Sequence, residues 1–232
     1  MSRFRSGNIQ IAMTVAPIEQ LYPSDPFGVR FLARGVNAVI DARPENLYFF
    51  TTFVGTHEVT VARGDCVFWL SDDLETASLN RGPTQIASRH LATVVRGYMP
   101  EDRSTTMHQG TTLPYVNGCS TKQLFPPERL GDPTLQLLYM PPHTTEQVHH
   151  IHSTVRVVYV LRGRGISVVG TAQHSTRQEL VPGMTCILEP MCPHHFETGV
   201  EPLVCIPLHV FSSSGSSELD HPMFRGTHLV GH

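Results

Sequence analysis

The chain of 232 residues lacks the sequence features that mark several common functional classes. Its 17 lysines and arginines are outnumbered by 20 aspartates and glutamates and form no basic stripe, which argues against a nucleic-acid partner. No helix-turn-helix pattern is visible that would read DNA. The sequence also contains no GxGxxG or P-loop phosphate motif and no GxSxG elbow around a nucleophilic serine. Nucleotide-dependent chemistry and serine hydrolysis therefore have no support.

Cysteine is scarce, and its spacing indicates neither disulfides nor a zinc site. The five cysteines are an odd number and include no CxxC pair. An early apolar stretch, residues 9–13, is interrupted by Gln10 and followed by Thr14, so neither a signal peptide nor a membrane span is predicted. We therefore expect reduced thiols, a cytoplasmic location and no membrane partner.

Sustained helical periodicity is missing as well. The 18 glycines and 18 prolines punctuate short apolar runs, a pattern typical of an all-β protein with many turns. Strands are expected in the first half at 36–40, 47–54, 57–62, 66–70 and 91–97. In the second half they are expected at 135–140, 155–161, 166–169, 184–188 and 203–211. Short strands at this spacing favour a sandwich or a barrel.

The strand pattern divides the chain into two β-rich parts. Residues 1–100 and 134–211 are expected to form one domain each, and the Pro/Gly-rich stretch 101–133 is expected to connect them. The glycines at the turns of the first part echo those of the second, which favours two related halves. Residues 212–232 begin with a serine-rich run and are expected to form a hinge and a tail.

Histidine is abundant in this chain. Most of its 14 histidines lie at or after His143. In the stretch His149-His150-Ile151-His152, the side chains of His150 and His152 point to the same side if the segment is extended. His194 follows a later turn, so it is positioned to complete a set of three imidazoles. Three imidazole nitrogens suit a divalent metal and leave other coordination positions open.

The motif around these histidines resembles the two conserved motifs of the cupin superfamily. His150-x-His152 is followed by Gly163, and Pro182-Gly183 precedes Pro193-His194 at the spacing of the second motif. The resemblance covers residues 134–211 and implies a cupin-type double-stranded β-helix, a jelly-roll barrel. With the echo in the first half, two tandem cupin barrels are an option, the first of them metal-free. Since one fold hosts many chemistries, the resemblance says little of function.

The chain departs from the cupin pattern at Arg156, where the family usually carries a glutamate as a further metal ligand. A guanidinium cannot ligate a metal, so the resemblance implies a three-histidine site. Strand parity places Arg156 on the face of His150 and His152 if the extended run is unbroken. It would then clamp a substrate carboxylate. The alternative is a structural arginine that turns outward to a carboxylate such as Glu146.

Other polar residues remain as candidates or rivals. Tyr139 and His209 lie on flanking strands and are candidate catalytic proton donors. His195 is a rival metal ligand if the turn register differs by one residue. His149 points away from the pair and is expected at the surface or behind the ligands.

The function most favoured by this pattern is a non-haem iron(II) dioxygenase that acts on a small, metal-chelating, anionic substrate. Three-histidine cupins include iron dioxygenases that act on thiols and on diketones. Zinc, nickel or manganese would instead support a lyase, isomerase or cyclase, because imidazole suits all of these metals. A small-molecule-binding cupin without turnover is a further alternative. A homodimer is expected, because pairing of chains would cover exposed sheet edges.

Overall fold

The computed structural model describes residues 26–42, 50–108, 110–129, 131–210 and 227–229. This part of the chain is almost entirely β-structure, which confirms the predicted all-β class. Its helical content is one 3-10 turn, Val116–Gly118. Among the described residues, no helix is long and apolar enough to cross a membrane.

The strands divide between two barrels. The first barrel contains β2 (Ala38–Asp41), β3 (Phe50–Val54), β4 (His57–Val61), β5 (Asp65–Leu70), β6 (Thr76–Arg81), β7 (Thr84–Ser88), β8 (Leu91–Arg96) and β9 (Arg103–Thr106). The second contains β1 (Val29–Leu32), β10 (Leu113–Pro114), β11 (Ser120–Phe125), β12 (Thr134–Met140), β13 (His150–His152), β14 (Arg156–Gly163), β15 (Gly165–Gly170), β16 (Ser175–Leu180), β17 (Thr185–Leu188), β18 (His194–Glu197), β19 (Leu203–His209) and β20 (Thr227–Leu229).

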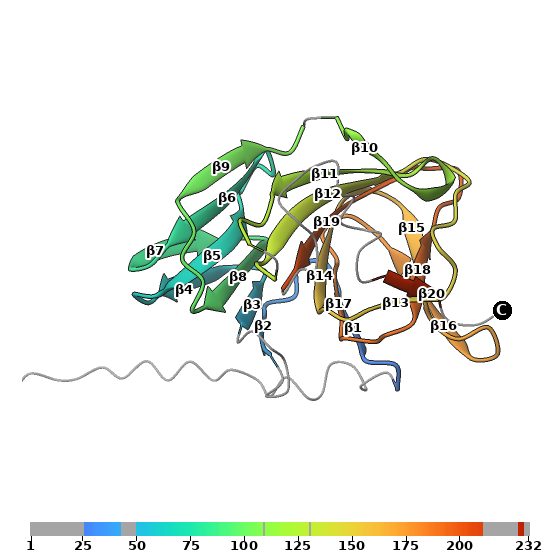
Figure 1. Ribbon diagram of the computed structural model, residues 1–232, viewed down its shortest axis with the longest axis horizontal. Coiled ribbons are helices and arrows are strands. Elements are labelled where there is room, and N and C mark those ends of the chain that lie inside the picture. Colours follow the sequence, from blue (N-terminus) through green and yellow to red (C-terminus); the bar gives the residue numbers. More distant parts are fainter. Residues whose placement is uncertain (1–25, 43–49, 109, 130, 211–226, 230–232) are drawn as a thin grey trace, which may run out of the picture.

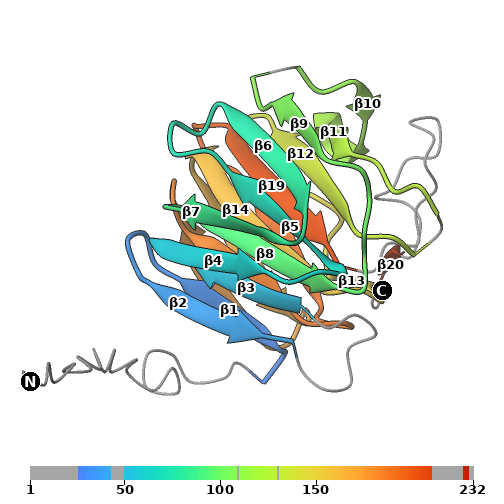
Figure 2. The same ribbon diagram turned by 90° about the vertical axis from the view of Figure 1, so that its left-hand side faces the viewer.

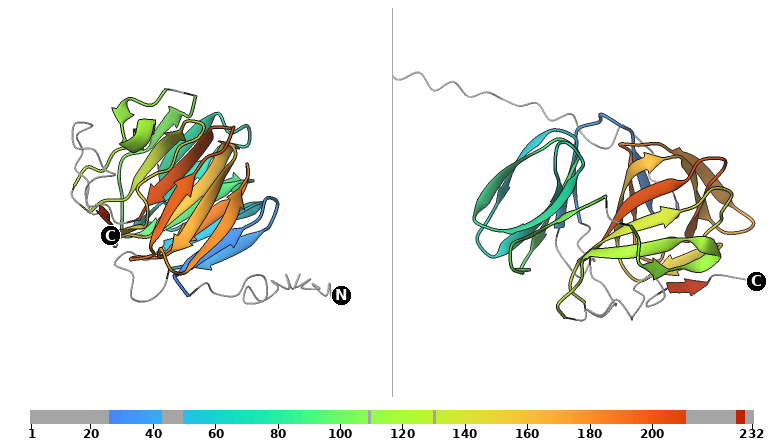
Figure 3. Two further views of the ribbon diagram at one scale, coloured as in Figure 1. Left: turned by 90° about the vertical axis from the view of Figure 1, so that its right-hand side faces the viewer. Right: turned by 90° about the horizontal axis from the view of Figure 1, so that it is seen from above.

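Each barrel is a pair of facing antiparallel sheets (Figures 1 and 2). The second barrel has a seven-stranded sheet in the order β1-β17-β14-β19-β12-β11-β10 and a five-stranded sheet in the order β16-β15-β18-β13-β20. The first has a six-stranded sheet, β2-β3-β8-β5-β6-β9, and the pair β4-β7. Figure 3 shows the two barrels side by side. The described part of the chain thus forms the predicted jelly-roll architecture, in the two-barrel arrangement that the sequence left as an option.

Side-chain alternation along each strand decides what faces the inside of the second barrel. On β14, Val157 and Tyr159 belong to an apolar cluster shared with the first barrel, while Val158 and Val160 belong to the cluster inside the second barrel. The larger sheets of the two barrels therefore pack against each other through their outer faces. Tyr159 reaches across this contact, and its hydroxyl lies 3.2 Å from Nδ1 of His90. One face of the seven-stranded sheet thus fixes the barrels together, and the other lines the interior.

The structure differs from the expected domain boundaries in three places. Residues 101–133, expected as a connector, contribute β9 to the first barrel and β10 and β11 to the second. Strand β1, near the start of the chain, pairs with β17 of the second barrel. The serine-rich hinge at 212–217 lies outside the described residues, but the tail beyond it forms β20, whose backbone pairs with β13. Local sequence patterns do not show such pairings, because their partners are distant in the chain.

The turn after β14 depends on a glycine. Gly163 has a φ of +78°, and a Cβ there would overlap the carbonyl oxygen of Pro202. We expect Gly163→Ala to lower the free energy of unfolding by about 3 kcal/mol, because the left-handed backbone and the overlap both oppose a side chain. Urea denaturation measures this loss. Gly199→Ala is the control, because its Cβ would meet nothing within 4 Å. Equal stability of the two variants would contradict this account of the turn.

Candidate metal centre

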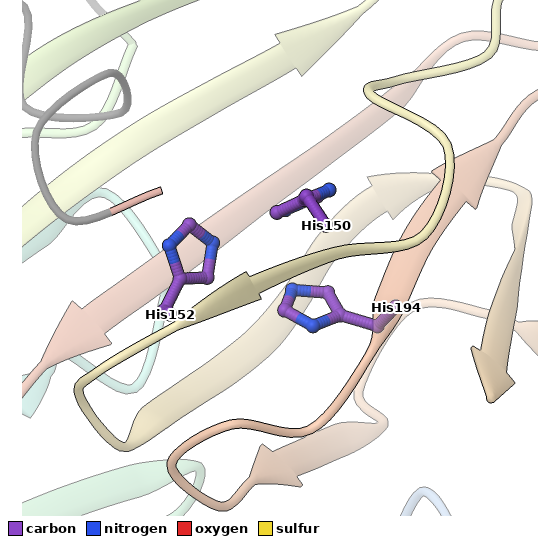
Figure 4. A group of neighbouring side chains, drawn as sticks. All are labelled: His150, His152 and His194. Carbon is purple, nitrogen blue, oxygen red and sulfur yellow. The ribbon is translucent and has the colours of Figure 1, made fainter. Parts of the chain in front are cut away.

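Three buried imidazoles meet inside the second barrel. His150 and His152 lie on β13, and His194 lies on β18, where it pairs directly with His150. Their ring centroids are 4.5 to 5.3 Å apart, and one nitrogen of each lies within 4.8 Å of the others. Figure 4 shows the rings turned toward one another from neighbouring strands. This spacing of the three nitrogens would suit ligation of one shared metal ion.

Backbone carbonyls orient two of these rings. Nδ1 of His150 lies 2.6 Å from the carbonyl oxygen of Gln147, and Nδ1 of His194 lies 2.8 Å from that of Cys192. Because a carbonyl only accepts, each Nδ1 carries the hydrogen and each Nε2 presents its lone pair. Nε2 of His150 is buried with no hydrogen-bond partner among the described residues. This arrangement is typical of metal-ligating histidines, whose other nitrogen is held by a hydrogen bond.

The two motifs that resembled the cupin pattern therefore meet in space. The HxH pair on β13 and the later histidine on β18 lie on adjacent strands of one sheet of a double-stranded β-helix. The second barrel thus has the cupin-type fold that the resemblance implied. The histidines line its five-stranded sheet, and the seven-stranded sheet faces them across the interior.

Comparison with known proteins finds a distant likeness to solved cupin structures. No protein-family model and no curated protein matches the chain. A cupin 2 conserved barrel domain protein from Leptotrichia buccalis matches with a TM-score of 0.44 and 11% identity over 77% of this chain and 91% of that one. The polyketide cyclase RemF from Streptomyces resistomycificus matches with a TM-score of 0.36 and 20% identity over 42% and 68%. A structure of the DMSP lyases RdDddP and RnDddQII matches with a TM-score of 0.38 and 17% identity, over 50% of this chain and 55% of that one. These similarities carry no information on the reaction.

Burial keeps the three imidazoles of the cupin barrel uncharged. It lowers the pKa of His150 to about 4 and the pKa values of His152 and His194 well below the ordinary value, and the positive charge of Arg156 lowers all three further. Metal binding requires the neutral imidazole, so no proton has to be removed near neutral pH. The donor set therefore fits a divalent ion.

The neighbouring histidines lie on the other side of the sheet. Nε2 of His195 lies 3.2 Å from Oε1 of Glu197, and its Nδ1 accepts a hydrogen bond of 3.3 Å from the backbone N–H of His149. The ring of His149 meets that of His195 edge-on at 5.1 Å. His195 thus alternates away from His194, and the structure does not bring this rival into the ligand group.

Arg156 faces the barrel interior. It is 5% exposed, shares its strand face with Val158 and Val160, and donates to the hydroxyl of Thr154. Parity along one unbroken strand was the reason for expecting this, and that reason is wrong, because β13 ends at His152 and Arg156 begins β14 in the facing sheet. The guanidinium and the imidazoles therefore approach from opposite walls.

Glu146, considered as a surface partner for Arg156, is itself inside. It is 3% exposed, and its Oε2 accepts a 3.2 Å hydrogen bond from the backbone N–H of Phe196. Burial raises the pKa of this carboxyl to about 7, although Arg156 and that N–H favour the charged form. The barrel thus holds a cation together with a buried acidic group whose pKa is raised.

The structure separates the two candidate proton donors. His209 on β19 pairs directly with Arg156 and shares the inward face of its strand with Leu203 and Cys205, and its buried Nε2 has no partner among the described residues. Tyr139 lies on the opposite face of β12, packed against the cluster between the barrels. His209 therefore faces the site, whereas Tyr139 is not brought to it.

Two inward glutamines were not singled out from the sequence. Gln136 shares its face of β12 with Leu138 and Met140, and Gln123 lies opposite it on β11. Gln136 could have been found in the sequence, because it is a single polar residue within an otherwise apolar strand. Gln123 gave no signal, because its stretch was interpreted as a connector.

The buried imidazoles make the stability of the metal-free protein depend on pH. The pKa values of His150, His152, His194 and His209 are lower in the folded protein, so below about pH 6.5 the unfolded chain binds more protons. Each group then costs up to about 1.4 kcal/mol per pH unit as the pH falls, until its folded pKa is reached. Glu146 acts in the opposite sense between pH 4.5 and about 7, but it is one group against these four and His195, whose pKa burial also lowers.

We therefore expect the metal-free protein to lose stability steadily from pH 6.5 toward pH 5. Urea unfolding at several pH values measures the slope. His209→Leu should reduce it, and replacement of the exposed His174 by alanine is the control. A stability that rises as the pH falls would contradict this interpretation.

Proposed function

We propose that this protein is a metal-dependent cupin enzyme in which His150, His152 and His194 hold one divalent ion. The observation that carries the proposal is the buried group of three neutral imidazoles, with two Nδ1 atoms held by carbonyls. Iron(II) is the preferred metal, and dioxygenation of a small anionic substrate is the preferred reaction. Bound iron(II) would supply open coordination positions and the redox chemistry that activates dioxygen.

The residues of the chain would bind and orient the substrate. Three neutral ligands leave the full charge of a divalent ion in place, which favours an anionic substrate. Arg156, on the facing sheet, would pair with a carboxylate held between it and the histidines. His209 lies beside Arg156 and would hold or release a proton at Nε2. The apolar cluster inside the barrel would exclude water from this region.

Glu146 supports a second candidate, a non-redox lyase, isomerase or cyclase. A carboxyl group with a pKa of about 7 exchanges protons readily at neutral pH, which suits general acid and base catalysis. Zinc, nickel or manganese on the same imidazoles would then act as a Lewis acid.

Metal content and oxygen uptake test these proposals together. Protein purified without an affinity tag under anaerobic conditions would be assayed by elemental analysis and then for oxygen uptake with small carboxylates, thiols and diketones. About one iron per chain with uptake supports the dioxygenase. Zinc, nickel or manganese at that ratio without uptake supports the second candidate. Absence of any bound metal would overturn both and favour a small-molecule-binding cupin.

A further inference from the structure

Two glutamine side chains face each other inside the cupin barrel without a partner. Gln123 on β11 and Gln136 on β12 are directly opposite in the antiparallel register and are 4% and 0% exposed. Neither the amide oxygen nor the amide nitrogen of either residue has a hydrogen-bond partner among the described residues. Both residues are therefore placed with four unused polar atoms on the inner wall.

The strand register shows which way these amides point. On β12, Leu135 and Leu137 belong to the cluster between the barrels, whereas Leu138 and Met140 belong to the cluster inside the second barrel. Gln136 lies between Leu135 and Leu137 in the strand, so its side chain points to the opposite face, which is the inner one. Its partner Gln123 lies on the same face, because residues directly paired across strands point to the same side.

The same wall carries Arg156 and His209. Arg156 pairs with His209 on β19, and His209 pairs with Thr134 on β12, two residues before Gln136. Strand spacing places the Cα atoms of Arg156 and Gln136 about 12 Å apart, two strands across and two residues along. The side chains shorten this span, so one ligand of several carbon atoms would reach both ends of the row.

The energetics argue that the amides serve a ligand. A buried amide without a partner costs about 1–3 kcal/mol relative to one that is satisfied, and an apolar side chain of the same size avoids that cost. Each amide offers one acceptor and one N–H donor group and carries no charge. The best complement is an uncharged group that both donates and accepts, which a primary amide does.

We propose that the row from Arg156 to Gln123 and Gln136 binds a small carboxylic acid whose far end carries a primary amide or a similar uncharged donor and acceptor. The carboxylate pairs with Arg156, and the amide end pairs with the two glutamines. The claim that this acid is the substrate rests on the proposed function. The binding of the acid depends only on the barrel wall opposite the histidines.

A pair of matched ligands tests the inference in the full-length protein. 4-Carbamoylbutanoate carries the amide, and 5-methylhexanoate replaces it with an apolar group of the same shape. Calorimetry on metal-free and metal-loaded protein should show about tenfold or greater preference for the amide, since a site built to hydrogen-bond rejects the analogue without that group. Gln136→Met should abolish the preference, and Gln123→Met is the second variant if the first does not fold.

Stability gives an independent readout. If the two amides are unpaired until a ligand binds, Gln136→Met should leave the ligand-free protein at least as stable in urea as the wild type, because the substitution removes an unpaired buried amide. Equal binding of the two acids by the wild type, or an unchanged preference in Gln136→Met, would overturn the inference. Failure of the proposed function has a different signature, namely no metal bound while the amide preference persists in metal-free protein.

Discussion

Replacing His194 with alanine is expected to remove the bound metal, whereas replacing its neighbour His195 is expected to leave it in place. The two residues are adjacent on β18, but only His194 points toward His150 and His152. Two remaining imidazoles hold a divalent ion far more weakly than three, so we expect metal content to fall from about one per chain to near zero. Any metal-dependent turnover should fall with it.

Elemental analysis after gel filtration measures this difference, and circular dichroism shows whether each variant keeps its β-structure. His195→Ala is a stringent control, because it removes a buried histidine from the same strand and breaks the contact with Glu197. Full metal content in His194→Ala, or its loss in His195→Ala, would show that the assigned ligand is wrong by one residue.

Arg156→Glu is expected to tighten metal binding by about a hundredfold or more. The substitution exchanges a positive for a negative charge on the wall facing the three imidazoles and restores the residue type usual in cupins. The charge on residue 156 already acts on all three imidazoles. At an effective dielectric constant of about 20, reversing a charge within several ångströms of a divalent ion changes the interaction by several kcal/mol, and tenfold in affinity is about 1.4 kcal/mol. The new carboxylate also lies near Glu146, which offsets part of the gain.

Competition with a metal chelator measures the affinity of the wild type and the variant. We also expect Arg156→Glu to be less stable than the wild type without metal and to recover when metal is added, because two buried carboxyl groups then share a cation. Arg162→Glu is the matched control, since Arg162 is an exposed residue of the same strand. An affinity that does not change in Arg156→Glu would place the side chain out of reach of the site.

The local part of the site could be predicted from the sequence. Strand parity put His150 and His152 on the same side, because it acts over a short distance, whereas the assignment of His194 rested on the resemblance to the two cupin motifs. The orientation of Arg156 was left open by the sequence, and the parity argument for the inward alternative does not apply. Three residues of loop follow His152, so the arginine reaches the interior from the facing sheet rather than from the same strand.

The features that could not be predicted depend on pairing between strands that are far apart in the sequence. The stretch 101–133 is rich in proline and glycine, yet Ser120–Phe125 forms β11 because β12 supplies its hydrogen-bond partners. The orientation of Gln123 follows only from that register. Tyr139 shows a different limit. Its strand was expected at 135–140, but the side of the sheet on which its side chain lies depends on packing against the first barrel.

The pairing of β1 with β17 has a consequence for synthesis of the chain. Val29–Leu32 leaves the ribosome before its partner Thr185–Leu188, which follows about 150 residues later. At about 5–20 residues per second, this strand waits roughly 8–30 seconds while the first barrel is made. It must stay unpaired, or be held by other factors, during that time. The nascent chain thus has a period of exposure to misassociation that a variant shortened to begin after residue 32 would avoid, at the cost of an open edge beside β17.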